Sequence, residues 1–154
     1  MPLKENEPAP DFTLPSTSGK SFTLSKDLNN KPCILYFYPK DFTAGCTKEA
    51  CQFRDTFDVF RNVDIEVIGI SRDNIESHLR FKKQYKLPFE LLSDGSGKVA
   101  GLYKALVPVI GMTRRITYLL DKNHRIAAVF ESMFDAEKHI ATMVEKVKSG
   151  AISK

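Results

Sequence analysis

The sequence of 154 residues has no long apolar segment. Its longest uninterrupted hydrophobic run is the six residues from Cys33 to Tyr38, whereas a membrane-spanning helix needs about 18 or more. We therefore expect no transmembrane segment. The first residues, Met-Pro-Leu-Lys-Glu-Asn-Glu, lack both the apolar core of a secretory signal and the arginines of a transit peptide. We expect a cytoplasmic protein.

Cysteine and histidine are scarce. Three cysteines cannot form a dense disulfide framework, and an odd number in a reducing compartment favours reactive or buried thiols. The Cys-x-x-Cys spacing of zinc sites and of many thiol-disulfide oxidoreductases is absent. His78, His124 and His139 lie far apart in the sequence. We expect them on the surface, and we expect no metal site.

No clustered basic segment is present either. Lys and Arg number 23 against 19 acidic residues, a net charge of +4, and they occur singly or in pairs. Nucleic-acid binding needs a basic face, so we expect none. The chain has no repeat, low-complexity tract or linker, and its 42% hydrophobic and 27% charged residues are typical of globular proteins. We expect a single domain over residues 1–154.

Strand-like and helix-like segments alternate along the chain. The expected elements are a β-hairpin around residues 16–20, a strand at 33–38, a helix at about 43–61, a strand around 65–70, a helix from a capping box of Asp73 and Glu76 to about Tyr85, a strand at 89–92, a short helix around 99–103, a hairpin of strands 115–120 and 125–130, and a last amphipathic helix marked by Ala136, Ile140, Met143 and Val147. Strands alternating with helices pair in parallel through right-handed crossovers, and the second hairpin adds an antiparallel pair. We therefore predict a thioredoxin-like α/β fold: a mixed central sheet, helices on both faces and an N-terminal β-hairpin.

Cys46 is the cysteine placed for chemistry. It falls in the first turn of the helix after the central strand, where free backbone N–H groups and the helix dipole favour a thiolate. The thiolate is the nucleophilic form, so position favours Cys46 over Cys33 and Cys51. If Thr43 is the N-cap residue, Cys46 is the third residue of the helix.

Two segments resemble peroxiredoxins. The stretch Tyr-Pro-Lys-Asp-Phe-Thr-Ala-Gly-Cys at 38–46 is similar to their Pro-x-x-x-Thr-x-x-Cys signature, and Arg-Ile-Thr-Tyr at 115–118 resembles their Arg-x-Thr-aromatic strand. The Cys-x4-Cys spacing of Cys46 and Cys51 resembles the bacterioferritin comigratory protein subfamily, also called peroxiredoxin Q. The resemblance spans essentially the whole chain.

The resemblance implies an enzyme that reduces hydrogen peroxide and alkyl hydroperoxides, needs no cofactor and is recycled by thioredoxin, with glutaredoxin as the alternative. It implies Cys46 as the peroxidatic cysteine, Cys51 as the resolving cysteine, and Pro39, Thr43 and Arg115 around them. Arg115 would favour the thiolate and orient a peroxide oxygen. The Thr43 hydroxyl can both donate and accept, and Pro39 can shield the site because it has no N–H.

The implied disulfide conflicts with helix geometry. Residues five apart in a helix are rotated by about 140° and raised by about 7.5 Å, so their Cα atoms lie roughly 8.6 Å apart. A disulfide tolerates about 7 Å. We therefore predict local unwinding from Thr43 to about Gln52 in each cycle. Ala44 stands where relatives commonly have proline, a favoured first helical residue, and should ease this unwinding.

Other residues leave alternatives open. Cys33 starts an apolar strand and is expected to be a small core hydrophobe. Strand alternation turns Arg114 away from the site that Arg115 faces. Glu49 can accept a hydrogen bond from Arg115 or be a plain solvated helix residue. The apolar loop 105–112 could line the site, contact a second copy or pack as an ordinary loop.

Two other functions are alternatives to the peroxidase. One is a general thiol-disulfide oxidoreductase, which the missing Cys-x-x-Cys motif disfavours. The other is a peroxide-sensing binding module in which unwinding exposes a partner surface. Since resolution within one chain requires no second copy, we expect a monomer.

Overall fold

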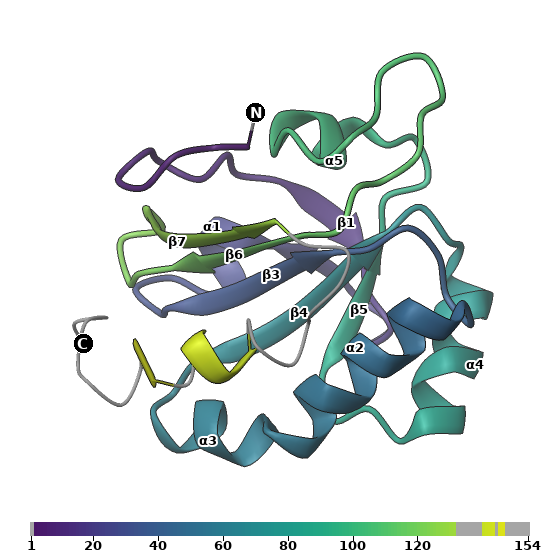
Figure 1. The fold of residues 1–154 in the computed structure, drawn as a ribbon, viewed down its shortest axis with the longest axis horizontal. Helices are drawn as coiled ribbons and strands as arrows, with labels where there is room; N and C mark the ends of the chain where they lie inside the picture. The colour runs from purple at the N-terminus through teal and green to yellow at the C-terminus, as the bar shows by residue number, and fades with distance from the viewer. Residues whose placement is uncertain (1, 132–139, 144, 147–154) are drawn as a thin grey trace.

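A five-stranded sheet forms the centre of the computed structural model, which describes residues 2–131, 140–143 and 145–146 (Figure 1). The elements are β1 (Thr13–Pro15), β2 (Ser21–Thr23), α1 (Leu24–Asp27), β3 (Cys33–Phe37), α2 (Ala44–Asp55), α3 (Phe57–Asn62), β4 (Glu66–Ser71), α4 (Ile75–Tyr85), β5 (Glu90–Ser93), α5 (Lys98–Leu102), β6 (Ile116–Leu120) and β7 (Ile126–Glu131). The strand order is β5-β4-β3-β6-β7. β3, β4 and β5 are parallel, and β6 is antiparallel to β3 and β7. β1 and β2 form the expected N-terminal hairpin.

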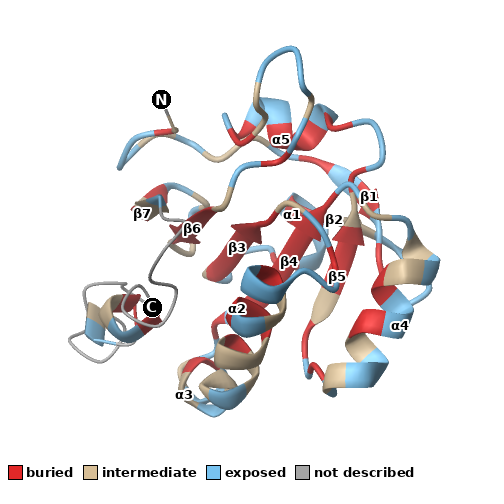
Figure 2. Cartoon of the chain, turned by 45° about the vertical axis from the view of Figure 1, so that its right-hand side comes forward, coloured by how far each residue is buried: buried red, intermediate tan, exposed pale blue. Residues whose placement is uncertain are grey.

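Two apolar cores lie on the two faces of this sheet. Alternate side chains of β3 enter different cores, as the pleat of a strand requires. Cys33, Leu35 and Phe37 pack with residues of α1 and α5, while Ile34 and Tyr36 pack with residues of α2, α3 and α4. Figure 2 shows β3 and β4 buried between these layers. The mixed sheet with helices on both faces is therefore confirmed.

The register of β3 and β6 places one site residue. Phe37, the last residue of β3, pairs with Ile116, the first residue of β6. Arg115 therefore lies beside the chain as it leaves β3 towards α2. The site is thus built where the carboxyl end of β3 meets the start of β6.

The single helix expected over residues 43–61 is wrong. The segment forms α2 and α3, separated at Thr56, whose φ and ψ are −104° and 5°. The Thr56 hydroxyl donates to the Gln52 carbonyl at 2.8 Å, and its backbone N–H also bonds back into α2. Threonine competes in this way with regular helix hydrogen bonding, so the helix is interrupted there.

The expected capping box of Asp73 and Glu76 is also wrong. Asn74 is the N-cap of α4, and its side-chain oxygen accepts from the Ser77 N–H at 2.8 Å. Asp73 instead accepts hydrogen bonds from the Asp41 N–H and the Ser71 hydroxyl.

The last amphipathic helix lies only partly within the described residues. Residues 140–143 are helical, and Ile140 and Met143 are buried as expected. Ala136 and Val147 lie outside the described part of the chain. Within that part, no helix has the length and apolar character needed to cross a membrane.

Candidate active site

Cys46 lies in the first turn of α2, as expected. Thr43 is the N-cap with extended backbone angles, so Cys46 is the third residue of the helix. The sulfur is almost fully buried, since only 1% of the residue is exposed. Helix geometry leaves the N–H groups of this turn without acceptors inside the helix, and their dipoles favour negative charge at the sulfur.

Arg115 joins Cys46 to Glu49. Its Nη2 donates to the Cys46 sulfur at 3.1 Å, and its Nη1 donates to Glu49 Oε1 at 2.6 Å. The planar guanidinium is therefore fixed at two points, which a lysine could not reproduce. Of the two alternatives for Glu49, the structure shows the hydrogen bond to Arg115. Arg114 is exposed, and both arginines lie just before β6 rather than in the strand.

Burial and charge oppose each other in this pair. Burial raises the pKa of Glu49 to about 7, although the adjacent Arg115 favours the carboxylate. Burial also disfavours the charge on Arg115, but the Glu49 and Cys46 charges outweigh it and raise the pKa of Arg115 above its usual value. Arg115 therefore remains a cation beside the sulfur at any physiological pH.

Gly45 is a site residue that sequence reasoning missed. A Cβ placed on it would lie 3.1 Å from Arg115 Nη2, so the arginine reaches Cys46 across a position without a side chain. The signal was a glycine inside a helical segment, where glycine is normally unfavourable and indicates a packing reason.

Thr43 and Pro39 flank the site without a described bond to the sulfur. The Thr43 hydroxyl donates to the Lys40 carbonyl at 2.8 Å, which closes the turn before α2. It is exposed and retains acceptor capacity. Pro39 is half-buried and follows Tyr38, whose N–H still bonds to β4 through the Ile70 carbonyl.

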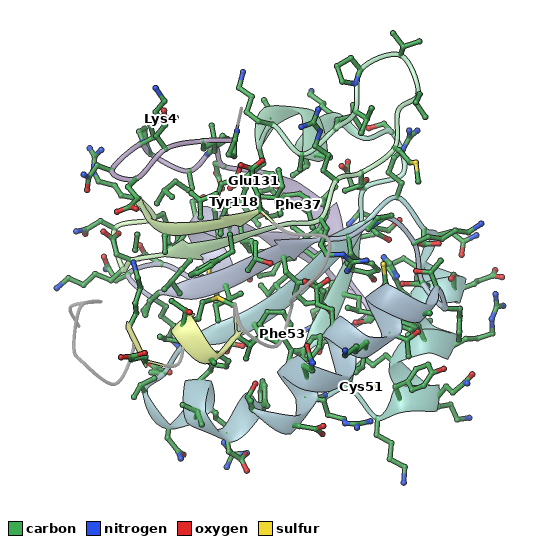
Figure 3. All side chains as sticks on the ribbon, viewed as in Figure 1. Lys4, Phe37, Cys51, Phe53, Tyr118 and Glu131 are labelled. Atoms are coloured by element: carbon green, nitrogen blue, oxygen red, sulfur yellow. The ribbon has the colours of Figure 1, made fainter. Side chains whose placement is uncertain are left out.

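The other two cysteines differ in their surroundings. Cys51 is half-buried and free, and α2 is continuous from Ala44 to Asp55, so both thiols lie in one intact helix. Figure 3 shows Phe53 on the sheet side of α2 and Cys51 farther from the sheet. Cys33 is fully buried in the core on the opposite face of the sheet, and burial raises the pKa of its thiol.

The expectation of surface histidines is wrong for His78. This residue is fully buried on α4, where it contacts Asp41 and the Leu92 carbonyl. The signal was its spacing, because His78, Phe81 and Tyr85 recur at intervals that put them on one helix face. His124 is half-buried and bonded to the Lys31 carbonyl, and His139 lies outside the described residues.

The apolar loop 105–112 does not pack throughout as an ordinary loop. Val109, Ile110 and Met112 are exposed at its tip. Arg72 supports the loop, because its Nη1 donates to the Gly111 carbonyl at 2.7 Å.

The comparisons with known proteins agree on one family. The AhpC/TSA family model matches residues 6–129. The chain is 45% identical over 141 residues to chloroplastic peroxiredoxin Q of Sedum lineare, covering 91% of this chain and 75% of that protein. It is 43% identical over 148 residues to that of Oryza sativa subsp. japonica, covering 96% and 68%.

Solved structures show the same likeness. Peroxidoxin BcpB of Mycobacterium tuberculosis superposes with a TM-score of 0.88 at 31% identity, covering 96% of this chain and 97% of that one. A cysteine variant of peroxiredoxin Q from Xylella fastidiosa gives 0.86 at 25% identity, covering 97% and 98%. With its cysteine at the start of α2 and its sheet of thioredoxin type, the chain belongs to the AhpC/TSA family, in the peroxiredoxin Q branch of thiol peroxidases.

Proposed function

We propose that Cys46 is the peroxidatic cysteine of this peroxidase. The observation that carries the proposal is the 3.1 Å hydrogen bond from Arg115 Nη2 to the Cys46 sulfur. The thiolate attacks one peroxide oxygen, the O–O bond breaks, and the leaving oxygen takes a proton to become water or an alcohol. Cys46 becomes a sulfenic acid.

The surrounding groups would support this step. Arg115 stabilises the thiolate and then the charge on the departing oxygen, which is the effect expected of a preorganised donor. Glu49 orients the guanidinium through the 2.6 Å bond. The Thr43 hydroxyl, whose hydrogen goes to the Lys40 carbonyl, would accept a hydrogen bond from a protonated peroxide at the exposed start of α2, and Pro39 would shield the sulfur from competing donors.

Cys51 is proposed as the resolving cysteine. Its thiol would attack the sulfenic sulfur, so that a disulfide forms and water leaves. Since α2 is continuous through both residues, their Cα atoms lie about 8.6 Å apart, and the first turns must unwind before the bond can close.

One experiment tests both roles. Reduced protein is treated with one equivalent of hydrogen peroxide, and thiols are mapped by mass spectrometry in the wild type, Cys46→Ser and Cys51→Ser. We expect a Cys46–Cys51 disulfide, no rapid reaction in Cys46→Ser, and an oxidised, unpaired Cys46 in Cys51→Ser. Rapid peroxide consumption by Cys46→Ser would refute the role of Cys46, and a wild-type product without the disulfide would refute that of Cys51.

Peroxides as substrates and thioredoxin-type reductants are properties of the family. We propose more specifically that this protein reduces both hydrogen peroxide and alkyl hydroperoxides, is recycled by thioredoxin rather than glutaredoxin, and acts as a cytoplasmic monomer. Cys46 and Cys51 in one helix support intramolecular recycling. The plant relatives carry chloroplastic in their names. Coupled turnover assays with each reductant, light scattering and cell fractionation test these points.

A further inference from the structure

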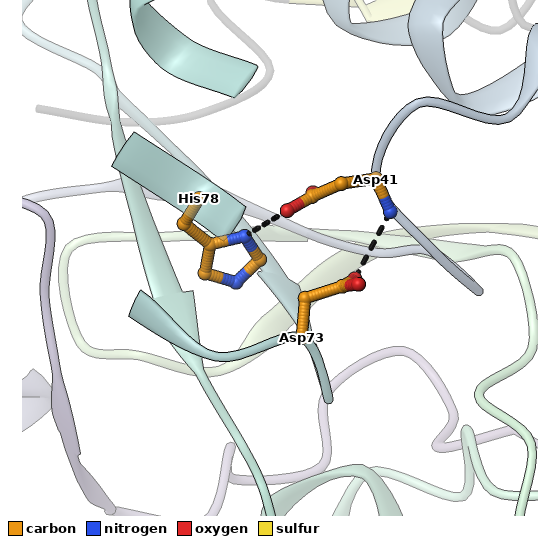
Figure 4. Close-up of side chains that lie close together, drawn as sticks. All are labelled: Asp41, Asp73 and His78. Carbon is orange, nitrogen blue, oxygen red and sulfur yellow. Dashed lines mark hydrogen bonds and ion pairs between the residues drawn. The ribbon is translucent and has the colours of Figure 1, made fainter. Parts of the chain in front are cut away.

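A buried Asp41–His78 pair lies beneath the turn that leads into α2 (Figure 4). Both side chains have 0% exposure, and His78 Nδ1 lies 2.7 Å from Asp41 Oδ2. On its other side, His78 Nε2 lies 2.9 Å from the Leu92 carbonyl oxygen. The pair thus connects the turn before Cys46 to α4 and β5.

The contacts indicate where the hydrogens of this pair lie. A carbonyl oxygen only accepts, so Nε2 carries a hydrogen towards Leu92. A second hydrogen must lie between Nδ1 and Asp41 Oδ2. The Tyr38 hydroxyl, 3.4 Å from Nδ1, directs its own hydrogen to Asp41 Oδ1 at 2.6 Å. The pair is therefore linked by a hydrogen bond in a site without solvent.

Asp41 is fixed by three segments of the chain. Its side chain accepts from the Tyr38 hydroxyl after β3 and from the Ser77 hydroxyl of α4, and it is hydrogen-bonded to His78 of α4. Its N–H donates to Asp73 Oδ2, just before α4, at 3.0 Å. Ligand atoms of Asp41, Asp73 and His78 lie within 4.8 Å of one another, as in a metal site. Since both His78 nitrogens and both Asp41 oxygens already have hydrogen-bond partners, the arrangement favours a structural role over metal binding.

Phe42, the residue after Asp41, has a strained backbone that this anchoring holds in place. Phe42 has a positive φ of 66°, which costs a side-chain-bearing residue about 1 kcal/mol or more. Its ring packs on Phe81 and Tyr85 of α4, with centroids 5.1 and 6.5 Å away. A strained turn persists only where its surroundings maintain it. α4 therefore contacts the turn twice, through His78 at Asp41 and through these rings at Phe42.

We propose that His78 is a positioning residue for the peroxide reaction. Through its hydrogen bond to Asp41, it fixes the turn from Lys40 to Thr43 and so sets where α2 begins and how closely Cys46 approaches Arg115. The inference rests on the proposed role of Cys46. It also implies that the unwinding needed for the disulfide starts after Asp41, because Asp41 stays hydrogen-bonded to α4.

Two isosteres of histidine separate positioning from simple core filling. In His78→Asn the amide nitrogen occupies the place of Nδ1 and can still donate to Asp41. In His78→Gln it occupies the place of Nε2 and can donate only to the Leu92 carbonyl. Each variant keeps one hydrogen bond and loses the other, so the two are matched in the number of bonds retained.

The readout is the second-order rate constant for oxidation of Cys46 by hydrogen peroxide, followed by quenched thiol mapping, with thermal unfolding of each variant alongside. We expect His78→Gln to react at least about tenfold more slowly, since an error of about 1 Å in position can cost 10²-fold. We expect His78→Asn to retain most of the wild-type rate. Equal rates for the two variants, or rates that follow their melting temperatures, would overturn the proposal.

Two further measurements complete the test. Hydrogen exchange at the Asp41 N–H should be slow in the wild type, faster in His78→Gln and unchanged in His78→Asn. Fast exchange in the wild type would overturn the proposed anchoring of Asp41, even if the variants failed to fold. Cys46→Ser separates the two proposals: if it stays active, the proposed function fails, whereas an inactive Cys46→Ser with a fully active His78→Gln rejects only the positioning role.

Discussion

Replacing Ala44 by proline should slow formation of the Cys46–Cys51 disulfide while leaving the peroxide reaction intact. Ala44 is the exposed first residue of α2, a position where proline is favoured because its missing N–H would have no acceptor inside the helix. The preceding Thr43 has φ −77° and ψ 151°, within the region that a residue before proline adopts. The substitution therefore fits the folded helix without strain.

The magnitude follows from the unwound state. A compatible proline stabilises an ordered segment by about 0.4–1 kcal/mol because it restricts the disordered chain. If unwinding precedes disulfide closure, this slows closure by a factor of about 2 to 5. Ala44→Gly should act in the opposite direction, since glycine disfavours the helix and enlarges the unwound ensemble. Disulfide formation should therefore be fastest in Ala44→Gly, intermediate in the wild type and slowest in Ala44→Pro.

The assay is a rapid-mixing experiment with a slight excess of hydrogen peroxide. Quenched samples are alkylated, and sulfenic acid and disulfide are counted by mass spectrometry against time. The second-order rate of Cys46 oxidation is the internal control, because none of these substitutions changes a group that touches the sulfur. Disulfide rates that are identical in all three proteins would refute the unwinding step as the limit on resolution.

Three further predictions concern Arg115, Glu49 and Gly69. Arg115→Gln should slow Cys46 oxidation by about 10²–10³-fold, the usual cost of removing one charge-stabilising donor, and Arg115→Lys should slow it less because the positive charge remains. Peroxide kinetics under pseudo-first-order conditions check this, and an Arg115→Lys variant as slow as Arg115→Gln would contradict the role of the positive charge. Burial raises the Glu49 pKa from 4.5 to about 7, so the folded state binds more protons than the unfolded state between these pH values. The contribution of Glu49 to the free energy of unfolding is therefore complete below about pH 4 and is lost as pH rises through 7, by up to about 3 kcal/mol. Urea unfolding at pH 5 and 8 should show this fall in the wild type but not in Glu49→Gln, and an equal fall in both proteins would exclude Glu49 as its source. Gly69→Ala should destabilise the fold by about 1–3 kcal/mol, because a Cβ there would lie 2.7 Å from Tyr36 and 2.8 Å from Leu91; an unchanged urea midpoint would show that these side chains can yield.

Much of the fold could be predicted because its signals are local. The apolar run at 33–38 is typical of a doubly buried strand, and β3 has every residue buried. The helix expected over 43–61 failed at Thr56, because a single threonine is a weak break signal and its effect depends on the hydroxyl bonding back to Gln52.

The site residues also differ in whether their signals are local in the sequence. Cys46 and Arg115 could be found from short motifs, since the motif register sets which residue faces the sulfur. The spacing of His78 indicates its burial, but its pairing with Asp41 could not be predicted, because Asp41 lies 37 residues away and meets it only once α4 packs beside β5. Gly45 was missed for a similar reason: the space it leaves is filled by an arginine from another strand.

The alternation of β3 between two cores also limits which oxidation products can form. Cys33 begins β3 and faces one core, whereas Cys46 follows the far end of β3 and belongs to the other. Five strand residues separate their levels by roughly 13 Å along the strand, and the sheet itself stands between their side chains. Oxidation of the folded protein therefore cannot join Cys33 to Cys46. Of the three thiols only Cys46 and Cys51 share a helix, so the proposed disulfide is the internal pairing that remains available once the start of α2 unwinds.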